Sequence, residues 1–192
     1  MEQRIRKRFD ESVSLARMAA EHLVGRIAQA AGVVTEALRA GRAVYVFGNG
    51  GSAADAQHMA CELVGRFLVD RPAYRAEALS ADVATLTSIA NDYGYEAVFA
   101  RPLAGKACPG DVAVALSTSG NSANVVAALA EARRIGCKTI ALTGSGGGRC
   151  AELADVLLDV PGHVTPRVQE VHQIIYHVLC ELVEEALAGD AS

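Results

Sequence analysis

The chain has 192 residues, of which 51% are hydrophobic, and its formal net charge is −4 at pH 7. This length and composition predict one folded domain, 1–192, with a core of its own. The basic residues are scattered, tryptophan is absent, and aromatic residues make up only 5%. The sequence therefore lacks the dense basic surface and the stacking side chains typical of a nucleic-acid-binding protein.

The cysteines indicate a reducing compartment. They are five in number, widely spaced and without a Cys-x-x-Cys pair: Cys61, Cys108, Cys137, Cys150 and Cys180. Such isolated thiols are typical neither of a disulfide framework nor of a thiolate zinc site. We find no signal-peptide pattern and no apolar run long enough to cross a bilayer. We therefore expect a cytoplasmic protein with no membrane partner.

Residues 3–40 are expected to form a long helix, because apolar residues recur every three or four positions from Ile5 to Ile27. Gly32 and Gly41 are expected to interrupt or end this helix. A helix of this length before the first strand has little of its own domain to cover. We expect it to pack against another subunit, with packing on its own sheet as the alternative.

Short apolar runs then alternate with helical segments. We predict strands at 43–47, 76–79, 111–116, 138–142 and 156–160, and helices at 52–64, 122–135, 149–153 and 165–187. This alternation is typical of a parallel sheet covered on both faces. The predicted fold class is an α/β three-layer sandwich with a central parallel sheet and long N- and C-terminal helices. The polar tail at 189–192 is expected to be disordered.

Three unusual turns follow predicted strands: GNGGS at 48–52, STSGNS at 117–122 and LTGSGGG at 142–148. Ligands of parallel α/β sheets bind beyond the carboxyl ends of the strands, where the free N–H groups of helix N-termini hold anions. The first two turns contain no lysine and no P-loop pattern. A single phosphate monoester therefore fits them better than a nucleoside triphosphate.

Each turn also has a second interpretation. The hydroxyl groups of 117–122 are compatible with ordinary helix caps, although four of them in six residues favour anion binding. GNGGSA matches the dinucleotide pattern G-x-G-x-x-A, but the acidic residue that this motif requires is represented only by Asp82. The turn at 142–148 is either a third anion site or a flexible connection.

His58 and Glu62 are four residues apart, so they share one face of the helix that follows GNGGS. A pair of this kind is often merely solvated, but its position behind an anion-binding turn favours chemistry. Gln169 and His177 interrupt the apolar stripe of the last helix. A histidine among apolar residues is more often part of a core. If the two helices pack together, these four side chains offer donors suited to zinc or a similar ion.

Several motifs together resemble the sugar-isomerase (SIS) domain family over nearly the whole chain: GNGGSAADAQH, GRF, RP, ANDYGY, STSGNSANV, LTG and VQEVH with a second histidine behind it. The resemblance is strongest to the branch that converts sedoheptulose 7-phosphate into D-glycero-D-manno-heptose 7-phosphate for lipopolysaccharide heptose. It implies an aldose–ketose isomerisation through an enediol. It also implies the SIS fold and a cytoplasmic homotetramer with active sites between subunits.

The resemblance also implies one zinc ion per subunit, held by His58, Glu62, Gln169 and His177. It implies contacts to the phosphosugar from these positions: Asn49, Gly50, Gly51, Ser52, His58, Glu62, Asn91, Asp92, Ser117, Thr118, Ser119, Ser122 and Gln169. We assign Glu62 as the base that moves a proton between neighbouring carbons, and His177 as the group that moves protons between the oxygens. A metal-bound carboxylate is a weaker base, so whether Glu62 is ligand, base or both stays open.

Two other functions are weighed against this one. The SIS family includes a non-catalytic tetrameric regulator that associates with the DnaA initiator, and the opening MEQRIRKRFDESV resembles that branch at least as well as it resembles the isomerase. The regulator's pattern lacks the acid and the histidine found here at Glu62 and His177, which favours the isomerase. An isomerase acting on a different phosphosugar is the third possibility.

Overall fold

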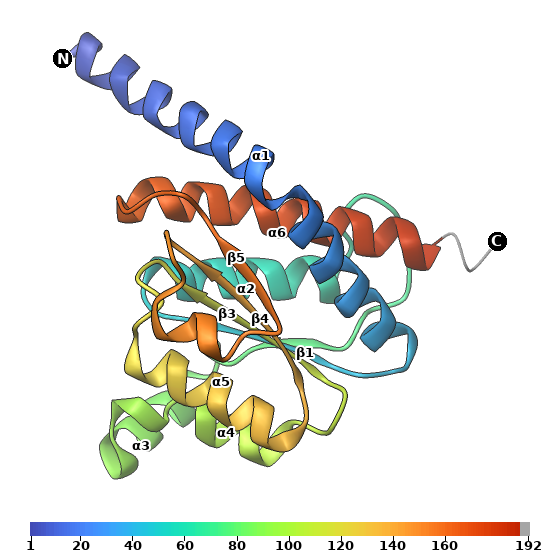
Figure 1. Ribbon diagram of the computed structural model, residues 1–192. Coiled ribbons are helices and arrows are strands. Elements are labelled where there is room, and N and C mark those ends of the chain that lie inside the picture. The colour runs from blue at the N-terminus through green and yellow to red at the C-terminus, as the bar shows by residue number, and fades with distance from the viewer. Residues whose placement is uncertain (189–192) are drawn as a thin grey trace.

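The computed structural model describes residues 1–188, so the tail at 189–192 lies outside the described residues. One five-stranded parallel sheet forms the centre of the molecule, in the order β2-β1-β3-β4-β5. Its strands are β1 (Val44–Gly48), β2 (Ala76–Ala78), β3 (Val112–Ser117), β4 (Lys138–Thr143) and β5 (Val156–Asp159). Helices cover both faces of the sheet (Figure 1), which confirms the predicted three-layer α/β/α fold.

The sheet separates two apolar cores, because successive side chains of a strand point to opposite faces. On β1, Val44 and Val46 belong to one core, and Tyr45 and Phe47 belong to the other. The first core is covered by α1 (Glu2–Arg39), α2 (Gly51–Val64) and α6 (Thr165–Ala188). The second is covered by α3 (Val83–Tyr93), α4 (Ala100–Lys106) and α5 (Ala123–Ile135).

α1 is a single helix of 38 residues that runs through Gly32, so the expected interruption there is wrong. A glycine inside a helix costs only about 1 kcal/mol relative to alanine, and the buried neighbours Ala31 and Val34 hold this stretch against the core. Gly41, with φ 71°, lies just beyond the end of the helix. The N-terminal half of α1 projects past the rest of the molecule (Figure 1). In the described part of the chain, no helix is long and apolar enough to cross a bilayer.

Every predicted strand is present, and the predicted helix at 149–153 is a 3-10 helix, η2 (Gly148–Glu152). The sequence prediction missed α3, α4 and the 3-10 turn η1 (Tyr95–Ala97). Asp82 is the N-cap residue of α3, and its carboxylate accepts a hydrogen bond of 3.1 Å from the backbone N–H of Thr85. Asp82 is therefore a helix cap, which removes the acidic residue that the dinucleotide interpretation needed.

The strand order places a topological switch point between β1 and β3. The chain leaves β1 to form β2 on one side of it, and returns to form β3 on the other side. The loops after β1 and β3 therefore diverge, and open α/β sheets bind ligands in the crevice this creates. GNGGS and STSGNS are the turns that follow these two strands.

Candidate active site

The GNGGS turn is connected directly to the start of α5. Asn49 and Asn124 pair through their amides, each donating from Nδ2 to the other's Oδ1, at 2.9 and 2.8 Å. Gly50, with φ 57° and ψ −120°, occupies a backbone conformation that L side chains rarely adopt. This amide pair therefore joins the N-termini of α2 and α5 at the switch point.

The hydroxyl groups of STSGNS mostly face one another or the turn itself. Ser117 Oγ and Ser122 Oγ are 3.2 Å apart, and Ser119 Oγ accepts the backbone N–H of Asn121 at 3.1 Å. Ser122 is the N-cap residue of α5, but its side chain makes no capping hydrogen bond. The ordinary-cap interpretation therefore fails at Ser122, the position where it was most natural.

The turn at 142–148 packs against the STSGNS turn and is hydrogen-bonded to its backbone. The N–H of Gly144 donates to the carbonyl of Thr118 at 3.1 Å, and the N–H of Cys150 donates to the carbonyl of Gly120 at 2.9 Å. A Cβ on Gly120 would lie 2.0 Å from the carbonyl oxygen of Gly147, so the two turns approach this closely only with glycine. The glycines of LTGSGGG thus have a packing role next to the second turn.

α2 and α6 pack side by side and bring His58, Glu62 and His177 together. His58 Nε2 lies 3.0 Å from Glu62 Oε1 and 3.5 Å from His177 Nε2. The two imidazole rings meet edge to face, with centroids 5.0 Å apart. The side chains of His58 and Glu62 are 37% and 21% exposed, so a ligand can reach them. The two helices therefore meet as the sequence analysis required.

His177 sits in a setting that favours its neutral form. Burial, reinforced by the neighbouring His58, lowers the pKa of His177, and the Glu62 carboxylate only partly opposes this. The Phe67 ring lies 5.8 Å from the His177 ring, centroid to centroid, and shields that side. A neutral imidazole is the form that accepts a proton or donates a lone pair to a metal.

Gln169 lies at the beginning of α2 and not against the histidines. A Cβ on Gly51 would be 2.8 Å from Gln169 Nε2, and the same nitrogen is 3.5 Å from Ser52 Oγ. Within residues 1–188, no hydrogen bond joins Gln169 to His58 or His177. Gln169 therefore lies at the GNGGS end of the predicted site.

The donor atoms fit zinc in their chemistry and in their pairwise spacing. Zinc ligands stand about 2.0–2.1 Å from the ion, so two donors of a tetrahedron are about 3.3 Å apart. The separations of 3.0 and 3.5 Å around His58 Nε2 bracket that value. Across residues 1–188, however, no three His, Cys, Asp or Glu side chains form a complete metal-binding arrangement.

Asn91 and Asp92 lie at the exposed end of α3, where Asn91 Nδ2 donates to Asp92 Oδ1 at 2.7 Å. The same ANDYGY segment reaches the GNGGS turn through Tyr95, whose hydroxyl donates to Asn49 Oδ1 at 3.0 Å. The sequence analysis missed Tyr95, although the segment itself was singled out. It also missed Asn124, whose partner across the switch point depends on the strand order.

A buried carboxylate anchors the loop that covers His177. Glu184 of α6 accepts the three backbone N–H groups of 67–69 and the Nε–H of Arg71, the last at 3.0 Å. Burial by itself raises the pKa of Glu184, but these N–H groups and the guanidinium outweigh it and hold the pKa low. The loop carrying Phe67 is therefore tied to the same helix as His177.

Comparison with known proteins agrees with this architecture. The family model of the SIS domain matches residues 9–144, which identifies the class: an SIS-domain protein. The phosphoheptose isomerase of Akkermansia muciniphila is 51% identical over 167 residues, covering 87% of this chain and 88% of the relative. That of Rhodospirillum rubrum is 53% identical over 163 residues, covering 85% and 87%.

A solved structure extends the likeness to three dimensions. The phosphoheptose isomerase of Neisseria gonorrhoeae superposes with a TM-score of 0.91 at 40% identity, covering 96% of this chain and 98% of that one. Within the SIS class, the chain belongs to the phosphoheptose isomerase family.

Proposed function

We propose that this protein isomerises sedoheptulose 7-phosphate to D-glycero-D-manno-heptose 7-phosphate. The observation that carries the proposal is the meeting of His58 and Glu62, on the helix that starts at the GNGGS turn, with His177 of α6. The relatives named phosphoheptose isomerase support the choice of substrate. A non-catalytic regulator that associates with DnaA does not require a carboxylate and imidazoles in contact with one another. The presence of Glu62 and His177 therefore does not favour that alternative.

The reaction moves a carbonyl group from C2 to C1 without changing the composition of the sugar. One proton leaves C1 and one is added at C2, while the C1 hydroxyl loses a proton and the C2 oxygen gains one. Glu62 exchanges the carbon-bound protons on one face of the enediol, as a positioned carboxylate can. His177, neutral at rest, carries the proton between the two oxygens and helps to open the cyclic sugar.

We propose one zinc ion per subunit. The residues that would hold it are His58, Glu62 and His177, which lie together, and Gln169, which lies at the GNGGS end of the site. When bound, the ion would supply positive charge that polarises the carbonyl group. Glu62 presents Oε1 to His58, and among the described residues its Oε2 has no hydrogen-bond partner. One oxygen of Glu62 is thus available for a ligand role and the other for the substrate proton.

The phosphate is proposed to bind between the GNGGS and STSGNS turns, with Asn91, Asp92 and the turn residues completing the substrate site. Replacing Ser119 with alanine is expected to raise KM for sedoheptulose 7-phosphate roughly 10- to 100-fold, because one hydrogen bond to a charged group is lost. kcat should change little. Steady-state kinetics measure both, with Ser145→Ala, an exposed serine of the supporting turn, as control. An unchanged KM would show that Ser119 does not contact the phosphate.

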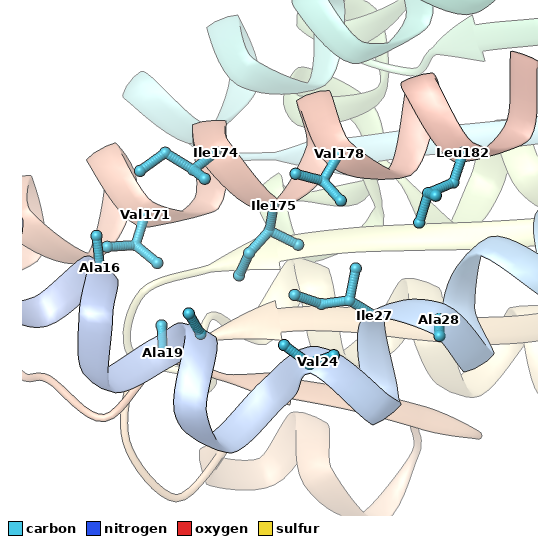
Figure 2. A pocket seen from close by; sticks show the side chains of 11 residues that line it. Ala16, Ala19, Val24, Ile27, Ala28, Val171, Ile174, Ile175, Val178 and Leu182 are labelled. Atoms are coloured by element: carbon cyan, nitrogen blue, oxygen red, sulfur yellow. The ribbon is translucent and has the colours of Figure 1, made fainter. Parts of the chain in front are cut away.

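The homotetramer, with active sites between subunits, is proposed to form through α1 and α6. An apolar groove of about 250 Å³ runs between these helices (Figure 2), lined by alanine and branched aliphatic side chains. Ile174, Val178 and Leu182 are 51%, 36% and 37% exposed along it, and Phe9 is 70% exposed on the projecting half of α1. Exposing these apolar side chains to water is unfavourable, and packing against another copy of the chain would bury them.

Light scattering tests this assembly. The wild type is expected to have four times the chain mass of 20.0 kDa, and Ile174→Glu is expected to have a smaller mass, because a charge is placed in the apolar groove. Val83→Glu, at a 68% exposed position on the opposite layer, serves as the control. A wild type that remains a monomer at micromolar concentration would reject the tetramer.

The cytoplasmic location and the supply of lipopolysaccharide heptose are parts of the same proposal. All five cysteines are free thiols, two of them exposed, and such thiols persist in a reducing compartment.

Incubation with sedoheptulose 7-phosphate tests the proposed function. Aldoheptose phosphate should accumulate, and a chelator should slow its formation. A protein that leaves the ketose unchanged would support the regulator instead. Faster turnover of a ketose phosphate of different chain length would support the third interpretation, an isomerase of another phosphosugar.

A further inference from the structure

The side of His58 that faces away from Glu62 is occupied by a residue to which the proposed reaction assigns no role. The hydroxyl oxygen of Tyr176 lies 2.9 Å from His58 Nδ1 and 3.5 Å from Asp55 Oδ1. The Tyr176 side chain is fully buried between α2 and α6, and its ring meets the His58 ring edge to face at 5.4 Å. Both ring nitrogens of His58 therefore have partners.

This arrangement limits how protons can be distributed. A tyrosine hydroxyl has one proton to donate and can also accept. If Tyr176 donates to His58 Nδ1, a neutral imidazole carries its proton on Nε2 and donates it to Glu62. If Tyr176 donates to Asp55 instead, its oxygen can accept from Nδ1–H, and Nε2 is left with a free lone pair. The position of the hydroxyl proton thus goes with the tautomer of His58.

We propose that Tyr176 is a positioning residue whose hydroxyl, turning between His58 and Asp55, selects which nitrogen of His58 carries the proton. The hydroxyl oxygen of Tyr176 lies nearer to His58 Nδ1 than to Asp55 Oδ1, at 2.9 against 3.5 Å, and the shorter contact favours the state in which Tyr176 donates to Nδ1 and Nε2–H faces Glu62. In the other state Nε2 offers its lone pair to a metal ion, and the pair Asp55–Tyr176 holds Nδ1–H. This inference rests on the proposed metal-binding role of His58.

The surroundings of the hydroxyl support such a two-position role. The hydroxyl is buried between His58 Nδ1 and Asp55 Oδ1, so rotation about its C–O bond is enough to move its proton from one acceptor to the other. Partners that orient a metal-binding histidine through its second nitrogen typically change metal affinity about 10- to 100-fold when removed. Tyr176 occupies that place for His58.

Tyr176→Phe removes the hydroxyl and keeps the ring that fills the space between the helices. Tyr45→Phe is the matched control, since Tyr45 is also buried, at 6% exposed, and its hydroxyl donates to the carbonyl of Lys106 at 3.2 Å, outside the site. Long-range ¹H–¹⁵N spectra of the imidazoles at about pH 8.5, above the usual titration range of histidine, report the tautomer of each ring. Competition with a chromophoric chelator reports zinc affinity.

In the metal-free wild type, His58 is expected to carry its proton on Nε2, and zinc is expected to move it to Nδ1. Tyr176→Phe is expected to bind zinc about 10- to 100-fold more weakly, and Tyr45→Phe is expected to bind it as tightly as the wild type. A metal-free His58 protonated on Nδ1 overturns the proposal, and so does zinc affinity unchanged by Tyr176→Phe. Neither readout uses substrate. A protein that gives both expected results but does not isomerise sedoheptulose 7-phosphate rejects the proposed function alone.

Discussion

Glu62→Gln is expected to lower kcat for sedoheptulose 7-phosphate by about 10²- to 10⁴-fold, the usual contribution of a general base. The amide has nearly the shape of the carboxylate but cannot take a proton from carbon. KM should stay within a few-fold of the wild type, because the phosphate-binding turns are untouched. Stopped assays of aldoheptose formation measure the change.

Two controls separate chemistry from folding. Glu185→Gln replaces an exposed glutamate near the end of α6 and should retain full activity. The melting temperature of Glu62→Gln should match that of the wild type, since among the described residues the Glu62 carboxylate is hydrogen-bonded only to the partly exposed His58, and the bond from Arg71 goes to the backbone carbonyl of Glu62. A Glu62→Gln enzyme with nearly normal kcat would show that the base is a different residue.

His177→Ala is expected to lower kcat by a similar factor of about 10² to 10⁴. The substitution removes the imidazole whose Nε2 lies 3.5 Å from His58 Nε2, and with it the group that moves protons between the sugar oxygens. It also removes one proposed zinc donor, so zinc content should fall together with kcat. Kinetics and metal analysis of the purified variant test both effects.

His22→Ala is the matched control for His177→Ala, because His22 is an exposed histidine of α1 whose Nδ1 lies 2.7 Å from the carbonyl oxygen of Met18, one turn earlier on the same helix. It should leave kcat unchanged. Added imidazole should restore part of the activity of His177→Ala if the lost group acts in proton transfer. Nearly normal kcat without imidazole would show that His177 only packs between the helices and takes no part in proton transfer.

The sheet was predictable because its signal is local. The residues of β1 and β3 are all buried, and such continuous apolar runs ending in glycine or serine are distinctive. α3 and α4 were missed because they lack such a signal. α3 buries only Ile89, and α4 has seven residues and buries only Leu103. Their positions depend on the core beneath α5 more than on their own periodicity.

The candidate site was predictable where it depends on one helix and unpredictable where it depends on two. The spacing of His58 and Glu62 places them on one face of α2 without further information. Their contact with His177 requires α2 and α6 to pack together, which spacing along the chain cannot establish. Tyr176 was overlooked because it stands within an apolar stripe, where a tyrosine is indistinguishable from an ordinary core residue.

Isomerisation of sedoheptulose 7-phosphate in D₂O tests the central claim most directly, since an acid–base group at His58, Glu62 and His177 must exchange protons with the sugar. The aldoheptose 7-phosphate formed is expected to carry solvent deuterium at C2, as NMR would show, and Glu62→Gln is expected to form almost none of this product. Aldoheptose formed equally fast by Glu62→Gln, with the same deuterium content at C2 as the product of the wild type, would contradict the account.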